Sequence, residues 1–417
     1  MDQPLITNDA VVLGLLLVIL AVIFKTSNSK RPAFQKFYTF VPALLLCYFI
    51  PSVFNSLGII SGDVSQLYYV SSRYLLPASL ILLTLSIDLK RIIDLGPKAI
   101  LMFLTGTFGI LIGGPLAILI VSAFAPDVVG GAGPDAVWRG LATVAGSWIG
   151  GGANQTAMKE VFGASDDLFS AMITVDVIVA NIWMGVLLYG AGRNKKIDKM
   201  LKADSSAIED VKRTIQEFRD KVTKVPSLSD VTTVVAVGFG GTAIAHLVAD
   251  GMAPLVEHLS AVYNLPLERF SLTSKFFWLI IAATTLGLIL SFTKVRNLEG
   301  VGASRIGSLL LYILVASIGM KMNVLAILDQ PGLFVVGLIW MSIHAGLLIL
   351  VAFLSKSPFF FVAVGSQANV GGAASAPIVA SAFSPSLAPV GVLLAVVGYA
   401  LGTYAAYICA VLMQLVS

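Results

Sequence analysis

The stretch Ala145-Gly-Ser-Trp-Ile-Gly-Gly-Gly-Ala-Asn-Gln-Thr-Ala157 is echoed later in the chain by Val364-Gly-Ser-Gln-Ala-Asn-Val-Gly-Gly-Ala-Ala-Ser-Ala-Pro377. Each copy contains Gly-Ser, a glycine doublet, an asparagine and a small hydroxyl residue. Both copies lie in apolar segments long enough to reach membrane depth, where broken backbone is tolerated only if it is buried in protein or lines a cavity. The two stretches therefore predict two halves of one site.

The composition is that of a membrane protein. Of the 417 residues, 57% are hydrophobic and only 12% are charged, and the mean hydropathy is +0.91, whereas charged residues make up about a quarter of a typical soluble domain. The first hydrophobic run, 10–24, lacks the basic leader of a signal peptide, so we expect a spanning helix there. Cys47 and Cys409 lie in apolar runs, which predicts neither a disulfide framework nor a metal site.

The apolar segments define the expected membrane topology. About ten of them are near the roughly 17 to 25 residues that a crossing needs: 10–24, 38–54, 69–87, 99–124, 167–192, 229–253, 275–292, 305–323, 331–354 and 386–415. The glycine-rich segments, 138–163 and 357–384, are left over. Lys and Arg concentrate in five loops: 25–36, 88–98, 193–228, 293–305 and 354–358.

All five basic loops share one side of the membrane only if each glycine-rich segment returns to the side from which it entered. Because cations favour the cytoplasmic side, we predict two re-entrant segments, both termini outside and a cytoplasmic loop 193–228 that contains a short amphipathic helix. The protein is expected to be a multi-pass component of the cell (inner) membrane. The basic loops indicate topology and do not predict nucleic acid as a partner.

An odd number of crossings in each half inverts the second half relative to the first. Ser86-Ile-Asp-Leu-Lys90, Gly96-Pro97 and the first Gly-Ser recur in the same order as Ser317-Ile-Gly-Met-Lys321, Pro331-Gly332 and the second Gly-Ser. Inverted repeats with discontinuous helices are typical of secondary transporters. The predicted fold is an all-α polytopic membrane protein with two inverted five-helix repeats, 1–192 and 229–417, each with a glycine-rich re-entrant or broken helix.

The glycine doublets predict where a solute binds. Without side chains the backbone can unwind, and freed helix N-termini then face anions while freed carbonyls face cations. Small residues also permit close helix packing, but two such stretches at matched positions favour a site. The expected solute ligands are Ser147, Gly151, Gly152, Asn154, Ser366, Asn369, Gly371 and Gly372.

A carboxylate lies deep in an apolar segment. Asp176 is nine residues into the segment 167–192, about 14 Å along a helix, where a charge is costly enough to require an interior position. We predict that it binds a coupling cation; the alternatives are a buried structural hydrogen bond or a protonated acid. Thr156, Gln367 and Asn181 are the expected further ligands, although Asn181 lies about 140° around the helix from Asp176.

For the other polar residues within apolar segments, structural roles are at least as strongly indicated as functional ones. Lys159 is expected either to neutralise a substrate carboxylate or to extend toward water, and Arg73 to extend toward water. His246 and Asp250 are four residues apart on one helix face and predict a structural hydrogen bond or a proton pair. No P-loop, dinucleotide fingerprint or metalloprotease motif is present, and the segment around Ser147 contains no histidine, so we expect no enzyme.

The first motif, with Asp176 downstream, and Gly365-Ser-Gln-Ala-Asn-Val-Gly-Gly372 resemble the YjcL-like family of uncharacterised integral membrane proteins over almost the whole chain. More distantly, the plan is similar to the bacterial sodium/glutamate symporters, whose Gly-Gly-rich re-entrant loops carry different flanking residues. This second resemblance implies a core domain that holds the two breaks, a scaffold domain, a homodimer in many members and an elevator-like shift.

The sequence thus predicts a cation-coupled secondary transporter, driven by sodium, for a small polar or anionic organic solute. A sodium ion is the only bound cofactor expected, and the partners are the solute and the lipid bilayer. The alternatives are a sodium/proton antiporter that uses Asp176, or a membrane sensor or channel without transport.

Overall fold

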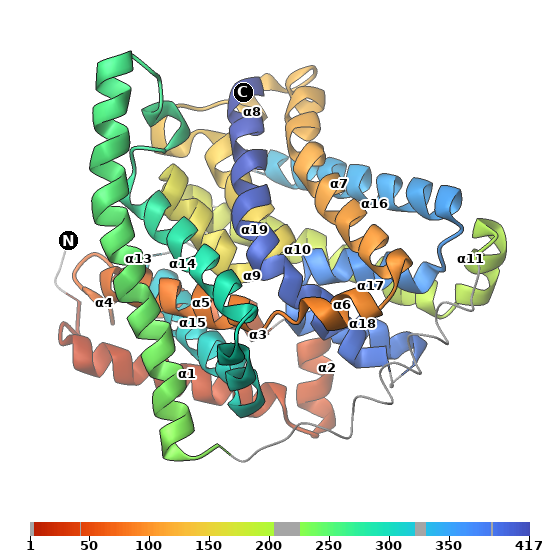
Figure 1. Ribbon diagram of the computed structural model, residues 1–417, viewed down its shortest axis with the longest axis horizontal. Coiled ribbons are helices and arrows are strands. Elements are labelled where there is room, and N and C mark those ends of the chain that lie inside the picture. Colours follow the sequence, from red (N-terminus) through yellow and green to blue (C-terminus); the bar gives the residue numbers. More distant parts are fainter. Residues whose placement is uncertain (1–3, 42, 204–225, 322–330, 385–386) are drawn as a thin grey trace.

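The computed structural model describes residues 4–41, 43–203, 226–321, 331–384 and 387–417, and the regular elements among them are all helices (Figure 1). The protein is therefore an all-α polytopic membrane protein, as expected. The amphipathic helix predicted within 193–228 rests on positions 206–222, which lie outside the described ranges. The described part of this loop contains a different short helix, α11 (Asn194–Leu201).

The first half of the chain begins with α1 and ends with α10. Its elements are α1 (Asp9–Ser27), α2 (Pro32–Phe40), α3 (Ala43–Ser56), α4 (Leu67–Val70), the π-helical turn η1 (Ser71–Leu75), α5 (Leu76–Leu85), α6 (Leu89–Asp94), α7 (Pro97–Ser122), α8 (Pro126–Val129), η2 (Gly133–Asp135), α9 (Val137–Phe162) and α10 (Asp166–Ala191).

The second half begins after α11. Its elements are α13 (Leu228–Tyr263), η3 (Glu268–Phe270), α14 (Lys275–Ser291), η4 (Lys294–Val301), α15 (Ala303–Gly319), α16 (Gly332–Ser355), α17 (Phe359–Val370), α18 (Gly372–Phe383) and α19 (Ala388–Val416).

The long apolar helices are fewer than the apolar segments of the sequence. Six described helices are long and apolar enough to cross a membrane: α1, α7, α10, α13, α16 and α19. The expectation of a single crossing helix over 38–54 is wrong, because α2 ends at Phe40 and α3 begins at Ala43. The segment 69–87 forms a continuous helix as far as Leu85, with the π-helical turn η1 within it ahead of Pro77.

The helices pack as two groups, and each group draws on both halves of the chain. In the first group, α7 packs on α16 and α17, and α19 packs on α9 and α18. In the second, α5 packs on α13, α14 and α15, and α3 packs on α1 and α15. Figure 1 shows the second group on the left and the first from the centre to the right. This division resembles the core and scaffold that the distant family likeness implies.

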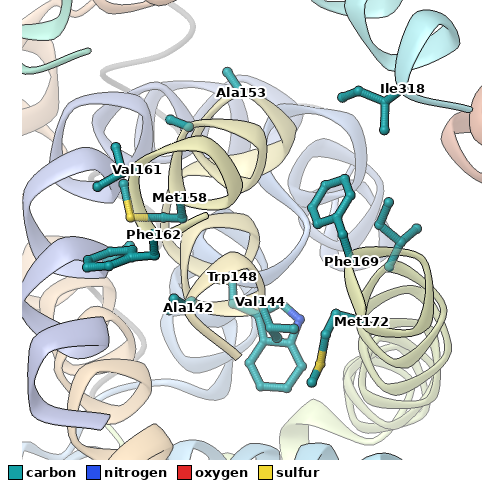
Figure 2. Packing of buried hydrophobic residues seen from close by; sticks show 14 of the residues in the cluster. Ala142, Val144, Trp148, Ala153, Met158, Val161, Phe162, Phe169, Met172 and Ile318 are labelled. Atoms are coloured by element: carbon teal, nitrogen blue, oxygen red, sulfur yellow. The ribbon is translucent and has the colours of Figure 1, made fainter. Parts of the chain in front are cut away.

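Apolar packing fixes α9 against α10. Trp148 of α9 and Phe169 and Met172 of α10 are buried in one hydrophobic cluster (Figure 2). The turn between these helices is short because Gly163, with φ of 62°, ends α9, and the Ser165 side chain caps the first turn of α10. Both hairpin arms described below are consequently held beside α10.

Candidate functional site

The first glycine-rich segment is a helical hairpin. Gly151 has φ of 75° and ψ of −174°, which no helix contains. A Cβ on Gly146 would lie 2.5 Å from the carbonyl oxygen of Asn154. In a continuous helix, residues eight apart are separated by about 12 Å, so the chain doubles back at Gly151 and its two arms lie side by side. The expected break is therefore present.

The second glycine-rich segment is also a hairpin. α17 ends at Val370 and α18 begins at Gly372, whose φ is 57°. The side-chain amide of Gln367 donates to the hydroxyl of Ser375 at 2.7 Å, again between residues eight apart on opposite arms. The break divides the segment into two arms of 12 residues each.

The tips of the two hairpins meet at one glycine of α19. A Cβ on Gly398 would lie 2.5 Å from the carbonyl oxygen of Ile149 in the first hairpin and 3.7 Å from that of Ala368 in the second. One turn further along α19, a Cβ on Gly402 would lie 2.4 Å from the Cα of Gly150. Glycine at these positions is what allows the hairpins to approach α19 and each other.

Asn154 and Asn369, both expected to hold the solute, instead anchor the hairpins to neighbouring helices. Asn154 donates to Gly150 O at 3.1 Å and Tyr399 O at 3.0 Å, and accepts from Thr403 at 2.5 Å. The Asn369 side chain donates to its own arm and to α7, and accepts from Thr107 at 2.7 Å. Both amide hydrogens of each residue are used within the protein, so in this conformation neither amide donates to a ligand.

Ser366 is also occupied. Its hydroxyl accepts from the indole of Trp183 and bonds to Nε2 of His344, both at 2.7 Å, while Nδ1 of His344 lies 3.0 Å from the carbonyl oxygen of Gly106. Since a carbonyl only accepts, Nδ1 carries the proton and Nε2 accepts from Ser366. This series of hydrogen bonds links α10, α17, α16 and α7 and fixes the first arm of the second hairpin near its tip.

Asp176 receives one hydrogen bond from each arm of the first hairpin. Its two carboxylate oxygens accept from the indole of Trp148 at 2.6 Å and from the side-chain amide of Gln155 at 3.0 Å, and its side chain is buried. Ser147 lies beside the same carboxylate. Of the other residues expected in the cation shell, Thr156 bonds to the carbonyl of Gly152 and Asn181 to that of Val177 in its own helix. The structure thus does not bring Asn181 to Asp176.

One enclosed polar atom at the second hairpin has no hydrogen-bond partner among the described residues: Oε1 of Gln367, whose amide folds over the tip glycine Gly371. An enclosed polar atom without a partner is costly, so this atom is a place where a ligand atom is needed. The hydroxyl of Tyr48 on α3 lies beside Thr156 and close to Asp176. Sequence reasoning missed Tyr48 because it lies in a different apolar segment from the glycine motifs.

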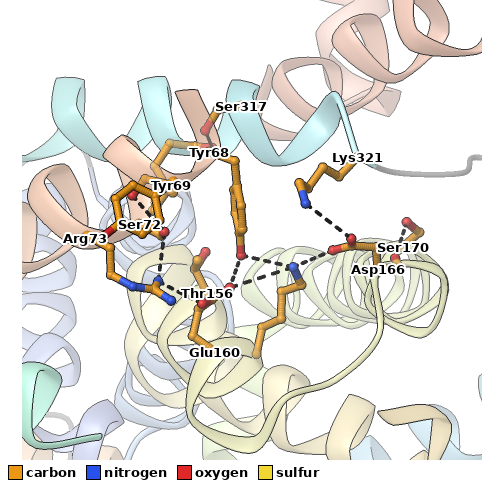
Figure 3. A network of polar contacts seen from close by, with 12 residues as sticks. Tyr68, Tyr69, Ser72, Arg73, Thr156, Glu160, Asp166, Ser170, Ser317 and Lys321 are labelled. Atoms are coloured by element: carbon orange, nitrogen blue, oxygen red, sulfur yellow. Dashed lines mark hydrogen bonds and ion pairs between the residues drawn. The ribbon is translucent and has the colours of Figure 1, made fainter. Parts of the chain in front are cut away.

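Beside the first hairpin, an ionic network joins the two helix groups (Figure 3). Lys159 is buried, lies 2.5 Å from Asp166, and bonds to the hydroxyl of Tyr68 at 3.0 Å. Tyr68 in turn donates to Glu160, which pairs with Arg73 at 2.9 Å. Arg73 was expected to extend toward water, and Lys159 either to extend toward water or to neutralise a substrate carboxylate. In the structure both side chains instead form ion pairs within the protein.

The remaining charged pair suggested by the sequence does not form. His246 bonds to the carbonyl oxygen of Arg73 at 2.9 Å, and Asp250 pairs with Lys275. The two side chains, four residues apart on α13, therefore contact different neighbours. A proton pair between them is not supported.

Comparison with known proteins places this arrangement in a family. A model of the family described as a protein of unknown function, DUF819, matches residues 14–416. The chain belongs to the DUF819 family. It is also 22% identical over 371 residues to the uncharacterised membrane protein YjcL of Bacillus subtilis (strain 168), which covers 84% of this chain and 85% of that protein. The resemblance read from the glycine motifs is confirmed.

The DUF819 match includes every element of the site. Residues 14–416 contain both hairpins, α10 with Asp176, and the α19 glycines. Together with the six long apolar helices, the comparison shows a multi-pass integral membrane protein. It names no solute or ion for the family.

Proposed function

We propose that this protein is a cation-coupled secondary transporter of a small polar or anionic organic solute. The observation that carries the proposal is the pair of hairpins, one from each half of the chain, whose tips meet at Gly398 of α19. Paired discontinuous helices of this kind form the substrate sites of secondary transporters. Each returning arm also begins at the tip, where backbone N–H groups favour anionic groups.

The solute site lies between the hairpin tips. Its groups are the backbone at Gly151–Gly152 and Gly371–Gly372, together with Oε1 of Gln367, which lacks a protein donor among the described residues. This acceptor requires a solute that carries a hydroxyl or amino donor. Asn154, Asn369 and Ser366 do not contact the solute in this proposal. Their side chains hold the hairpins against neighbouring helices.

The coupling cation is assigned to Asp176 and the hydroxyls beside it. Tyr48 and Thr156 supply oxygen atoms near the carboxylate, and oxygen ligands suit a hard cation such as sodium. The membrane potential supplies only about 2.3 kcal/mol per charge per 100 mV. Coupling must therefore arise because ion and solute each stabilise the same hairpin conformation.

The membrane topology and the motion complete the proposal. The basic loops, 193–228 above all, lie on the cytoplasmic side of the inner membrane and both termini lie outside. The halves 1–192 and 229–417 are inverted repeats, and the hairpin-bearing helix group moves relative to the other group in an elevator-like shift within a homodimer. Two helix groups that each contain elements of both halves support this division.

Uptake into proteoliposomes tests the transporter. The purified protein is first screened for thermal stabilisation by amino and carboxylic acids with and without sodium, and the stabilising solute is then used in flux assays. Asp176→Asn should reduce gradient-driven uptake at least tenfold. Asp167→Asn, an exposed aspartate on the same helix, is the matched control and should leave uptake unchanged. Uptake that ignores both sodium and proton gradients refutes the proposal.

A sodium/proton antiporter is the second candidate, and the environment of Asp176 favours it. Among the described residues no lysine or arginine forms an ion pair with this buried carboxylate, so an exchange of proton for sodium is a direct way to neutralise it. Sodium-driven proton movement in vesicles without any solute identifies the antiporter. A strict requirement for solute identifies the symporter.

A further inference from the structure

A cavity lies away from the hairpin tips, at the start of α9 and the end of α19. Its volume is about 390 Å³, and it is lined by Trp138, Arg139, Glu268, Arg269, Ser271 and Gln414. Arg139 is in the first turn of α9, Gln414 is in the last turn of α19, and the other three polar residues belong to the connection between α13 and α14. Figure 1 shows the C-terminal ends of α13 and α19 at the same, upper end of the molecule.

The charges around the cavity favour an anion. Two guanidinium groups face one carboxylate, that of Glu268, and none of the three forms an ion pair with another described residue. Arg139 donates through Nη1 to the carbonyl of Phe162 and packs on the ring of Trp138, with 4.8 Å from Cζ to the ring centre. The guanidinium is therefore fixed in place before any ligand arrives.

Two atoms of the cavity residues are enclosed without a hydrogen-bond partner in the described part of the chain. They are Nε of Arg139, which is a donor, and Oε1 of Gln414, which is an acceptor. An enclosed group without a partner loses its hydration and gains nothing in exchange. Both residues line the cavity, so an anionic oxygen for the Arg139 guanidinium and a hydroxyl or amino donor for the Gln414 side chain would give each residue a partner when the side chain turns toward the ligand.

Behind Trp138, the aromatic residue that lines the cavity, a hydrogen bond and stacked rings hold the wall in place. The hydroxyl of Tyr407 on α19 donates to the carbonyl of Phe270 at 2.6 Å, which ties the α13–α14 connection to α19. Tyr407 stacks on Phe162, and Phe162 packs edge-on against Trp138, each with ring centres 5.6 Å apart. Tryptophan and tyrosine gather where a protein meets the lipid headgroups, and we expect the cavity at the membrane surface for this reason.

We propose that this cavity is a binding site for an anionic group with a neighbouring hydroxyl or amine, as in a glycerol phosphate headgroup or a small hydroxylated acid. The phosphate or carboxylate oxygen binds Arg139 with the help of Arg269, and the neighbouring donor binds Gln414. The site lies at the far end of the first hairpin from its tip, where α9 begins, and does not depend on the transporter proposal. Phosphatidylglycerol and free glycerol 3-phosphate carry the same chemistry from lipid and from water.

Thermal unfolding of the full-length protein in detergent tests the site. Added phosphatidylglycerol, glycerol 3-phosphate or both should raise the unfolding temperature, whereas phosphatidylcholine, whose headgroup has no donor, should not. Stabilisation by the lipid alone identifies a headgroup site, and stabilisation by both ligands shows that the soluble anion suffices. If neither phosphatidylglycerol nor glycerol 3-phosphate stabilises the protein, the proposal is refuted.

Variants locate the effect in the cavity. Arg139→Gln and Gln414→Leu should each weaken the apparent affinity about tenfold, as expected for a lost charge-assisted or enclosed hydrogen bond. Gln414→Leu should also raise the stability of the ligand-free protein, because it removes an atom without a partner. If Arg139→Gln does not fold, Arg269→Gln, at an exposed position, provides the same affinity test. Arg31→Gln, at an exposed arginine outside the cavity, is the control. Variants that bind as tightly as the wild type overturn the assignment.

Discussion

Replacing Gly398 by alanine tests the meeting of the hairpins on α19. The new Cβ would lie 2.5 Å from the backbone carbonyl oxygen of Ile149, about 0.9 Å closer than ordinary contact at 3.4 Å. Because the obstacle is backbone and not a flexible side chain, the first hairpin must withdraw, and overpacking of this kind costs about 1–3 kcal/mol. Alanine also favours the helix over glycine by about 1 kcal/mol. The expected net loss is therefore about 0–2 kcal/mol in the free energy of unfolding.

Gly185→Ala is the matched control, because a Cβ at Gly185 of α10 meets nothing within 4 Å. It should stabilise the protein by up to about 1 kcal/mol through helix propensity alone. The difference between the two variants, measured by unfolding in one detergent, isolates the clash and should be about 1–3 kcal/mol. Equal stability of the two variants would refute the contact between hairpin and α19. A Gly398→Ala protein that is folded but transports slowly would place the contact in the transport cycle.

Three further substitutions follow from the structure. Glu160→Gln removes the charge of a largely buried member of the ionic network and should cost about 1–3 kcal/mol in unfolding experiments, the cost of leaving its buried partners unsatisfied, whereas the exposed Glu257→Gln should cost almost nothing. Asn369→Ala removes three hydrogen bonds and, at about 0.6 kcal/mol for each bond in a membrane, should cost about 2 kcal/mol, against a smaller loss for Asn181→Ala, which bonds only to its own helix. Burial raises the pKa of the Asp198 carboxyl in α11, although the backbone N–H that donates to it opposes the shift. The native state therefore holds this proton more tightly than the unfolded chain, and stability should fall as the pH rises from about 4 through the raised pKa. Asp198→Asn should flatten that slope in a pH series of unfolding curves.

The hairpins could be predicted from the sequence because their cause is local. A glycine doublet inside an apolar segment has few stable uses in a membrane, and the distribution of cations decided between crossing and returning. In the structure each doublet contains one glycine with positive φ, Gly151 in the first and Gly372 in the second. Family membership could be predicted for the same reason, because the motif residues are contiguous in the sequence.

The roles of individual polar residues could not be predicted, because they depend on helices far away in the chain. Asn154 and Asn369 are of a residue type that often binds solutes, but distant threonines donate to their side-chain oxygens. Thr403 is 249 residues from Asn154, and Thr107 is 262 residues from Asn369. The same holds for Lys159, whose partner Tyr68 precedes it by 91 residues. A pattern shows that a buried amide or ammonium needs a partner; only the packing shows whether the protein or a solute supplies it.

The carboxylate of Asp176 provides a physical route for coupling in the proposed transporter. It accepts from Trp148 on the entering arm and from Gln155 on the returning arm, so its charge holds the two arms of the first hairpin together. A cation that binds the carboxylate weakens both bonds, and the Trp148 ring is packed against Trp340 of α16, with ring centres 5.0 Å apart. Because α16 precedes the second hairpin and contacts it through His344 and Ser366, occupation of Asp176 alters the supports of both hairpins. By reciprocity, a solute that orders the hairpin tips must then change the affinity for the cation by the same factor.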